Sequence, residues 1–208
     1  MNQTEYQLEK TELRRNIIKQ RQSLSEEEWR KKSQAICKNL LNSNLFNQAK
    51  TVLAYFTFRQ EPDLSYLFQD SEIPPTPLKK GGLKINSDSK KVWGFPRCVD
   101  KSLIWHLWTD DELITGKYGI KEPKPDSPII NSHQVDLILV PCVACDYQSY
   151  RLGYGGGYYD RLFSSFEWES VPTIGIVFDF AYLPQVPIEA WDKKLDNICT
   201  ETGLKVKG

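Results

Sequence analysis

The sequence lacks any hydrophobic run long enough to span a membrane. Its longest apolar runs, residues 135–141 and 174–178, are much shorter than the roughly 20 residues that a transmembrane helix needs. Residues 1–10 are polar and do not contain the apolar stretch of a signal peptide. We therefore expect a cytoplasmic protein that has no membrane partner.

The sequence also lacks an excess of charge of either sign. Its 27 Lys and Arg residues balance its 27 Asp and Glu residues, so the formal net charge is zero. Proteins that bind nucleic acid or anionic membranes over a broad surface carry a basic excess. We expect no nucleic-acid partner, and any anion that the protein binds must be held by a local cluster of side chains.

Cysteine and histidine are scarce. Five cysteines are an odd number for a secreted disulfide framework, and we interpret them as reduced thiols. Cys142 and Cys145 form a C-x-x-C pair, but a zinc site would need two more ligands, so two buried thiols are the simpler interpretation. The histidines are His106 and His133, and there is no G-x-S-x-G motif, so a Ser-His-Asp hydrolase has little support.

What the sequence does contain is a pattern of buried strands and helices. Apolar runs and alternating segments predict strands at residues 51–58, 92–95, 103–108, 135–140, 173–178 and 196–200. Helices are expected around Leu13 and Ile17, after a capping box made by Ser25 and Glu28, and at residues 64–68 and 158–166. The pattern predicts a single-domain three-layer α/β fold over residues 1–208 with a mainly parallel central sheet.

A glycine-rich segment, residues 151–161 (RLGYGGGYYDR), is the most informative part of the sequence. It follows a predicted strand and precedes a predicted helix, which is where ligands usually bind in α/β sheets. Glycines let the backbone approach a ligand closely, and backbone N–H groups at a helix start suit a phosphate. Arg151 can add a charge-assisted contact, and Asp160 is placed to share Mg²⁺ with bound phosphates.

The glycine-rich segment is neither a Rossmann fingerprint nor a Walker A loop. Tyr158 stands at the last glycine position of the first motif, and no Gly-Lys-Ser/Thr completes the second. A plain turn that uses glycine for positive φ, and an Asp160 that interacts only with the helix dipole, are the simpler alternatives. Four glycines within five residues, flanked by Arg151 and Asp160, favour anion binding.

Several motifs resemble the 5-formyltetrahydrofolate cyclo-ligase family, also called methenyltetrahydrofolate synthetases. The longest is VDLILVPCVACDYQSYRLGYGGGYYDR, residues 135–161, and the shorter ones are KTELR with Arg21 after it, AYFTFRQEPDL, WGFPR, YGIKEP and WDKKLDNICTE. Together they cover most of the chain, while the Pro- and Gly-rich residues 71–91, a predicted flexible connection, match poorly. Trp191, where bacterial relatives often have histidine, and Phe180 and Ala181, where a glutamine is often found, depart from the family pattern.

The resemblance implies an ATP- and Mg²⁺-dependent ligase that cyclises 5-formyltetrahydrofolate to 5,10-methenyltetrahydrofolate and releases ADP and phosphate. The partner would be this small folate, with or without a polyglutamate tail, and the enzyme would be a monomer. Two alternatives stay open. One is a phosphosugar isomerase or CoA-transferase-like enzyme that uses the same loop, and the other is a non-catalytic protein that binds nucleotide or folate.

The resemblance also implies roles for individual residues. Lys10 and Arg151 would act in catalysis. ATP would contact Lys10, Thr11, Glu12, Leu13, Arg14, Arg151, Leu152, Gly153, Tyr154, Gly155, Gly156, Gly157, Tyr158 and Tyr159. The folate would contact Phe56, Glu61, Tyr118, Tyr154, Gly155, Gly156, Gly157 and Tyr158, and Mg²⁺ would be held by Asp160 and Asp192. Without the resemblance, a solvated basic helix face, a turn at Glu61, core packing of Phe56 and a surface acid at Asp192 are the simpler interpretations.

Overall fold

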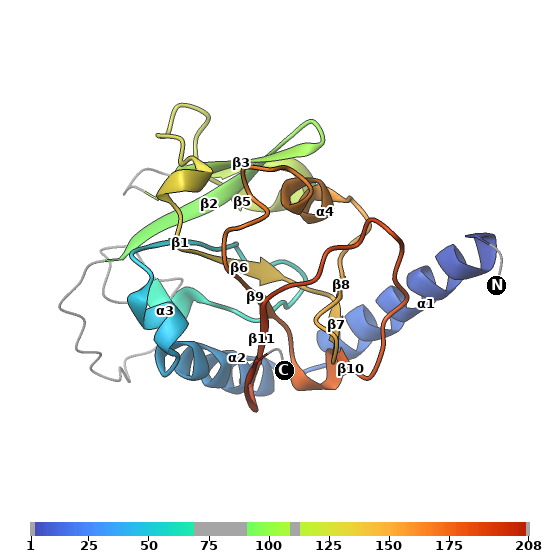
Figure 1. Cartoon of the computed structure of the whole chain (residues 1–208). Coiled ribbons are helices and arrows are strands. Elements are labelled where there is room, and N and C mark those ends of the chain that lie inside the picture. Colours follow the sequence, from blue (N-terminus) through green and yellow to red (C-terminus); the bar gives the residue numbers. More distant parts are fainter. Residues whose placement is uncertain (1–2, 69–90, 109–112, 207–208) are drawn as a thin grey trace.

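The computed structural model describes residues 3–68, 91–108 and 113–206 (Figure 1). The predicted flexible connection at residues 71–91 lies outside the described residues, except for Lys91. The elements in chain order are α1 (Gln3–Gln22), α2 (Glu26–Leu41), α3 (Asn44–Gln48), β1 (Thr51–Leu53), η1 (Ser65–Phe68), β2 (Val92–Val99), β3 (Ser102–Leu107), β4 (Ile114–Thr115), η2 (Lys117–Gly119), β5 (Lys121–Glu122), η3 (Ser132–Gln134), β6 (Leu137–Pro141), β7 (Ala144–Asp146), β8 (Arg151–Leu152), α4 (Tyr158–Phe163), β9 (Thr173–Ile176), η4 (Asp179–Ala181), β10 (Tyr182–Leu183), β11 (Asn197–Thr200) and β12 (Gly203–Val206).

A seven-stranded sheet forms the centre of the structure, in the order β12-β11-β9-β6-β1-β2-β3. The four inner pairs, β11–β9, β9–β6, β6–β1 and β1–β2, are parallel. The two edge pairs, β2–β3 and β11–β12, are antiparallel. The α/β fold with a mainly parallel central sheet, predicted from the sequence, is therefore confirmed.

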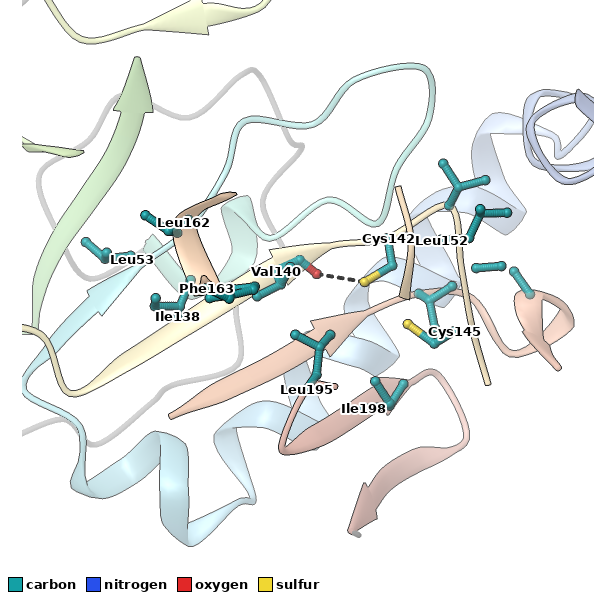
Figure 2. Packing of buried hydrophobic residues seen from close by; sticks show 14 of the residues in the cluster. Leu53, Ile138, Val140, Cys142, Cys145, Leu152, Leu162, Phe163, Leu195 and Ile198 are labelled. Atoms are coloured by element: carbon teal, nitrogen blue, oxygen red, sulfur yellow. Dashed lines mark hydrogen bonds between the residues drawn. The ribbon is translucent and has the colours of Figure 1, made fainter. Parts of the chain in front are cut away.

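Strand β6 shows why helices cover both faces of this sheet. Neighbouring residues of a strand point to opposite faces, and all four residues from Leu137 to Val140 are buried. Leu137 and Leu139 pack in one buried cluster with residues of α2 and α3, whereas Ile138 and Val140 pack in another with residues of α1 and α4. Figure 1 shows α2 and α3 on one side of the sheet and α4 on the other, and Figure 2 shows the second cluster from close by.

Helix α2 begins as its sequence predicts. The Glu28 N–H donates a hydrogen bond to the Ser25 hydroxyl (3.2 Å), and the Ser25 N–H donates to the Glu28 carboxylate (3.1 Å). This reciprocal capping box satisfies two of the N–H groups that a helix start leaves without partners. The helix then buries the apolar stripe that contains Ile36, Cys37 and Leu40.

Several element boundaries differ from the predictions. The strand predicted over residues 51–58 ends at Leu53, because the chain leaves the sheet and turns at Arg59 and Gln60, whose φ angles are 48° and 55°. The helix predicted to reach residue 166 ends at Phe163, and β2 continues to Val99. Helix α3 and the edge strand β12 were not predicted.

The C-x-x-C pair has the structural role expected of it. Cys142 and Cys145 are both buried and both free thiols. The Cys142 thiol donates to the Val140 carbonyl oxygen at 3.3 Å, the contact drawn in Figure 2, and burial raises the pKa of Cys145 well above its ordinary value. None of the helices in the described part of the chain combines the length and the apolar character that crossing a bilayer requires.

Candidate active site

A cavity of about 620 Å³ opens beyond the carboxyl ends of β1 and β6. In open parallel sheets this is the edge at which ligands bind. Most of its walls come from α1, residues 55–61 after β1, residues 118–122, the glycine-rich residues 151–160, and residues 189–192, and Pro96, Cys98, Leu103 and Pro141 of the central sheet complete them. The cavity therefore brings together segments that are far apart in the sequence.

Lys10 and Arg14 face this cavity from α1. Their i, i+4 spacing places them on one face of the helix. The Lys10 ammonium group is buried against two carboxylates, with Nζ at 2.8 Å from Glu189 Oε2 and 2.9 Å from Asp192 Oδ2. Burial alone would lower the pKa of Lys10, but its hydrogen bonds to Glu189 and Asp192 outweigh burial and raise it. Lys10 is therefore a fully charged cation whose position is fixed by the opposite end of the chain.

Arg14 ties α1 to the glycine-rich segment. Its Nε donates a hydrogen bond to the Gly153 carbonyl oxygen at 2.8 Å, and its guanidinium carbon lies 3.7 Å from the position that a Cβ would take at Gly155. Burial lowers the pKa of Arg14, and the neighbouring charge of Arg151 acts in the same direction, against Glu189 and Asp192. The two neighbouring guanidinium groups offer an anion charge-assisted hydrogen-bond donors, although Glu189, Asp192 and Asp160 balance the local positive charge.

The sequence context suggested that the glycine-rich segment follows a strand of the central sheet. The structure differs from this expectation. The segment follows β8, a buried two-residue strand paired with β7 in a small sheet of β10, β7 and β8. Gly157 has φ 67°, a conformation that glycine adopts readily, and a side chain at Gly153 would collide with the Arg151 guanidinium, 2.3 Å away. Because α4 has only six residues, the dipole of a long helix is not available here, and the loop N–H groups and arginines are the donors at hand.

Arg151 and Asp160 form an ion pair across this loop. Arg151 Nη2 lies 2.6 Å from Asp160 Oδ1, and the Arg151 side chain is almost fully buried. The guanidinium group also lies over the Tyr159 ring, 5.4 Å from its centre. The pair holds the two charged ends of the glycine-rich segment together, so the loop is shaped before any ligand arrives.

The two acids expected to hold Mg²⁺ both line the cavity, but both are paired with cations. Asp160 uses Oδ1 for Arg151, and Asp192 uses Oδ2 for Lys10 and for the Glu189 N–H. Among the described residues, the other oxygen of each carboxylate accepts no hydrogen bond, and no three His, Cys, Asp or Glu side chains cluster as a metal site. Since Mg²⁺ commonly takes one or two carboxylates and completes its shell with phosphate oxygens and water, these residues fit that ion in the presence of phosphates.

Glu61 is a buried acid at the opposite wall, 3% exposed. The turn at Arg59 and Gln60 bends the chain back so that the Phe58 N–H donates to Glu61 Oε2 at 3.0 Å. Burial raises the pKa of Glu61 to about 7, and the charge of Arg21 and hydrogen bonds from Phe58 and Tyr154 limit the rise. Glu61 can therefore change its protonation state near neutral pH.

Aromatic rings line the cavity beside Glu61. Phe56 stacks on Phe95 with ring centres 4.2 Å apart, and Phe58 meets the edge of Tyr154 at 5.8 Å. Phe56 is partly buried: one part of its side chain packs on the core, and another part faces the cavity. These rings offer a flat apolar surface next to an acceptor, which suits a planar heterocycle with N–H groups.

Tyr118 and Tyr158 meet at the outer rim of the cavity. Their hydroxyl oxygens are 3.5 Å apart, and Lys117 Nζ donates to the Tyr158 hydroxyl at 3.1 Å. Tyr118 is 57% exposed and has φ 66°, a strained conformation for a residue with a side chain. The buried Glu122 anchors this segment, because the Cys98 N–H donates to its carboxylate at 3.1 Å.

The structure places all the expected site residues on the cavity wall except Thr11, Glu12 and Leu13. These three lie between Lys10 and Arg14 on other faces of α1, where Thr11 and Glu12 are exposed and Leu13 packs on the core. Glu189 was missed, since nothing in its local sequence signals that it meets Lys10. Arg21 was seen as part of a motif but given no role, although it contacts Tyr154.

A match to a family model identifies the family of this chain. A model described as the 5-formyltetrahydrofolate cyclo-ligase family covers residues 7–201. The chain belongs to this family. The match takes in α1 from residue 7 on, the turn at Glu61, the glycine-rich segment and the segment around Asp192, so every residue that lines the cavity lies inside the cyclo-ligase match.

Individual relatives agree with this assignment to the cyclo-ligases. The chain is 27% identical over 188 residues to 5-formyltetrahydrofolate cyclo-ligase of Haemophilus influenzae, covering 90% of this chain and 95% of that protein. An Escherichia coli protein of the same name is 24% identical and covers 88% of this chain and 96% of its own length.

Solved structures share the fold. An NMR structure of Aquifex aeolicus 5,10-methenyltetrahydrofolate synthetase superposes with a TM-score of 0.77 and 31% identity, covering 95% of this chain and 92% of that one. The corresponding synthetase from Mycoplasma pneumoniae has a TM-score of 0.67 at 22% identity, over 92% of this chain and 98% of its own, and supports the fold alone. The cyclo-ligase fold thus accounts for nearly the whole chain.

Proposed function

We propose that this protein converts 5-formyltetrahydrofolate to 5,10-methenyltetrahydrofolate with ATP as co-substrate and Mg²⁺ as the metal. The single observation that carries the proposal is that the same cavity faces both the cations Lys10, Arg14 and Arg151 and the aromatic, acidic wall at Phe56 and Glu61. A polyphosphate and a flat heterocycle can lie in it side by side.

The chemistry explains why both must be held together. A formamide is a poor electrophile because its nitrogen donates electrons into the carbonyl group. Transfer of the terminal phosphoryl group breaks its bond to the bridging oxygen of ATP, forms a bond to the formyl oxygen, and releases ADP. N10 of the folate then attacks the formyl carbon, and loss of the N10 proton and of phosphate leaves the 5,10-methenyl bridge.

The protein's own residues align the reactants and offset charge. Lys10, Arg14 and Arg151 are proposed to contact the phosphates, together with the loop N–H groups, since phosphoryl transfer depends mainly on positioning and electrostatic stabilisation. Mg²⁺, when bound by Asp160 and Asp192, would neutralise phosphate charge. Because these carboxylates now pair with Arg151 and Lys10, a metal and a phosphate arriving together would satisfy all four groups.

The folate is proposed to lie against the opposite wall. Glu61 would accept hydrogen bonds from pterin N–H groups, and Phe56, Tyr154 or Tyr158 would contact the ring faces. The formyl group would then point toward the glycine-rich segment, which both substrates share. Tyr118 at the rim would cover the part of the ligand that is closer to solvent.

A coupled assay tests the proposed activity. The protein is mixed with ATP, Mg²⁺ and 5-formyltetrahydrofolate, and both ADP and the near-ultraviolet absorbance of the methenyl product are followed. We expect the two products in equal amounts, with ADP formed only when the folate is present. ADP formation without the folate would point to another phosphoryl-transfer enzyme, and binding of both ligands without product would point to a non-catalytic binding protein.

The partners proposed for this enzyme are small molecules only. The zero net charge supports a folate substrate over nucleic acid. We propose a monomer that acts in the cytoplasm and takes folate with or without a polyglutamate tail. Sedimentation at two protein concentrations tests the monomer, which should show one concentration-independent species.

A further inference from the structure

Arg21 is a buried arginine in the last turn of α1, 2% exposed, and it does not line the cavity. Its Nε donates a hydrogen bond to the Arg59 carbonyl oxygen at 2.9 Å, and its Nη2 donates to the Tyr154 hydroxyl. Its Nη1 is buried and has no hydrogen-bond partner within the described residues. Because a buried donor without a partner destabilises a fold, a role beyond stability explains this placement better.

Both partners of Arg21 belong to the cavity wall. Tyr154 lies in the glycine-rich segment, with its ring 5.7 Å from the Arg21 guanidinium carbon, and Arg59 is the first residue of the strained turn before Glu61. When its side-chain amide is turned so that the nitrogen faces α1, Gln60 can also donate to the Arg21 and Gln22 carbonyl oxygens, at 3.1 and 3.2 Å. The end of α1 therefore holds the turn that presents Glu61 and the loop residue that faces it.

We propose that Arg21 is a positioning residue for the folate: through the Tyr154 hydroxyl and the Arg59 carbonyl, it holds the Glu61 carboxylate where it can accept hydrogen bonds from the pterin. The inference rests on the proposed contact between Glu61 and the folate. It adds that the strength of this contact is set from α1, outside the cavity. It also links the glycine-rich segment to the folate wall through one hydroxyl group, that of Tyr154.

The charges around Glu61 determine how this arrangement responds to pH. Arg21 faces it from α1, Tyr55 from the chain after β1, Tyr154 from the glycine-rich segment and Tyr159 from α4. Burial raises the pKa of all three tyrosines above the ordinary value, so they stay protonated near neutral pH. Glu61 is then the group of this set that titrates there, and removing the Arg21 charge would shift its ionisation to higher pH.

The test measures kcat/KM for 5-formyltetrahydrofolate across the pH range from about 5.5 to 9, a span centred near the ionisation of a raised carboxyl. Variants of the full-length protein are Arg21→Gln, Arg21→Lys, Tyr154→Phe and Glu61→Gln, and Arg15→Gln is the control, since Arg15 is exposed on the same helix. Arg21→Gln should raise the KM for the folate about tenfold, with a smaller change in the KM for ATP. It should also move the midpoint of the pH profile upward by about one unit.

The other variants separate positioning from simple damage to the fold. Arg21→Lys keeps the charge but cannot serve both partners, so it should restore the midpoint while the KM for the folate stays raised. Arg15→Gln should match the wild type. Should Arg21→Gln fail to fold, Arg21→Lys decides, because it keeps the charge near Glu61 and should raise the KM for the folate without moving the midpoint.

Two results would overturn the inference. One is a folded Arg21→Gln or Tyr154→Phe protein with the wild-type KM and midpoint. The other is a change in KM that Arg15→Gln produces equally. Glu61→Gln identifies which idea fails: if it alone loses the pH step, Glu61 binds the folate without help from Arg21, and if it keeps the wild-type profile, the proposed Glu61 contact is itself wrong.

Discussion

Glu61 shows what a single buried carboxyl contributes at the scale of the residue. Its raised pKa means that the folded protein holds a proton on Glu61 over a range where the unfolded chain has released it. The stability that this group contributes is therefore fully present at a pH below its ordinary pKa of 4.5, and it is lost as the pH rises through its raised pKa of about 7. The site maintains a carboxylate at some cost to the fold.

Replacing Glu61 with glutamine should remove this dependence. Across the shift from 4.5 to about 7, the wild type should lose about 3 kcal/mol of stability relative to Glu61→Gln, from roughly 1.36 kcal/mol per pKa unit. Urea unfolding at a pH below and a pH above this window gives the free energy of unfolding of each protein. Equal pH slopes for the two proteins would contradict the raised pKa.

Arg151 is the residue on which phosphate binding should depend most directly. Arg151→Ala removes a charge-assisted contact worth about 1.5–3 kcal/mol, so we expect the KM for ATP to rise at least tenfold. Steady-state kinetics at saturating folate measure it, with Arg15→Ala, an exposed arginine on α1, as the control. A wild-type KM for ATP in Arg151→Ala would remove this residue from the nucleotide site.

At the scale of the element, the glycine-rich segment should be sensitive to its backbone shape. Gly157→Ala places a Cβ on a residue with φ 67° and within 2.5 Å of Arg161 Nη1, and such strain costs about 1–3 kcal/mol. Gly203→Ala is a matched control, because Gly203 has φ 140° with nothing within 4 Å of its Cβ position. Both variants should be less stable to urea, but only Gly157→Ala should raise the KM for ATP, and an unchanged KM would mean that the loop shape does not matter for binding.

The start of α2 gives a prediction that concerns stability alone. Ser25→Ala removes one half of the capping box and should destabilise the protein by about 1 kcal/mol. Ser23→Ala serves as the control, since the Ser23 hydroxyl donates to the Gln20 carbonyl oxygen and caps no helix start. Urea unfolding should show a lower free energy of unfolding for Ser25→Ala, while its enzyme kinetics stay unchanged. Equal losses of unfolding free energy in the two variants would contradict a role for the cap.

The sequence could predict those elements whose apolar pattern has a single structural explanation. Strands β6 and β9 are buried on both faces, and their mostly apolar sequences indicate this burial. The end of β1 could not be predicted in this way, because the chain after the strand continues with the aromatic residues Tyr55, Phe56 and Phe58, which line the cavity. A run of apolar residues does not tell whether it faces a core or a ligand.

At the scale of the whole molecule, the site joins residues that local patterns cannot connect. The pair of Lys10 and Glu189 spans 179 positions, so the sequence predicted a role for Lys10 only through family resemblance and gave none to Glu189. The Tyr6 hydroxyl also donates to the Ile188 carbonyl oxygen, which adds a second contact between the same two segments. The burial of Arg21 likewise depends on two segments that fold against it from elsewhere.

This arrangement predicts where a bound nucleotide should rigidify the protein. At about 100 times its Kd, ATP with Mg²⁺ should stabilise the fold by about 2.7 kcal/mol. Hydrogen exchange followed by mass spectrometry should slow in residues 7–14, 151–160 and 186–195. AMP, which lacks the outer phosphates, is the control and should leave residues 7–14 unprotected. Protection by ATP confined to other segments would place the nucleotide elsewhere.

The contact of α1 with the segment around Asp192 also has a consequence for synthesis in the cell. Lys10 is translated before the two carboxylates that hold it, and Glu189 follows it by 179 positions. A growing chain can thus form much of its sheet before Lys10 can pair with Glu189 and Asp192. Newly made protein can complete the Lys10 ion pairs only after residues 189–192 have been translated, and a protease that removes either of these two segments would abolish the pairs.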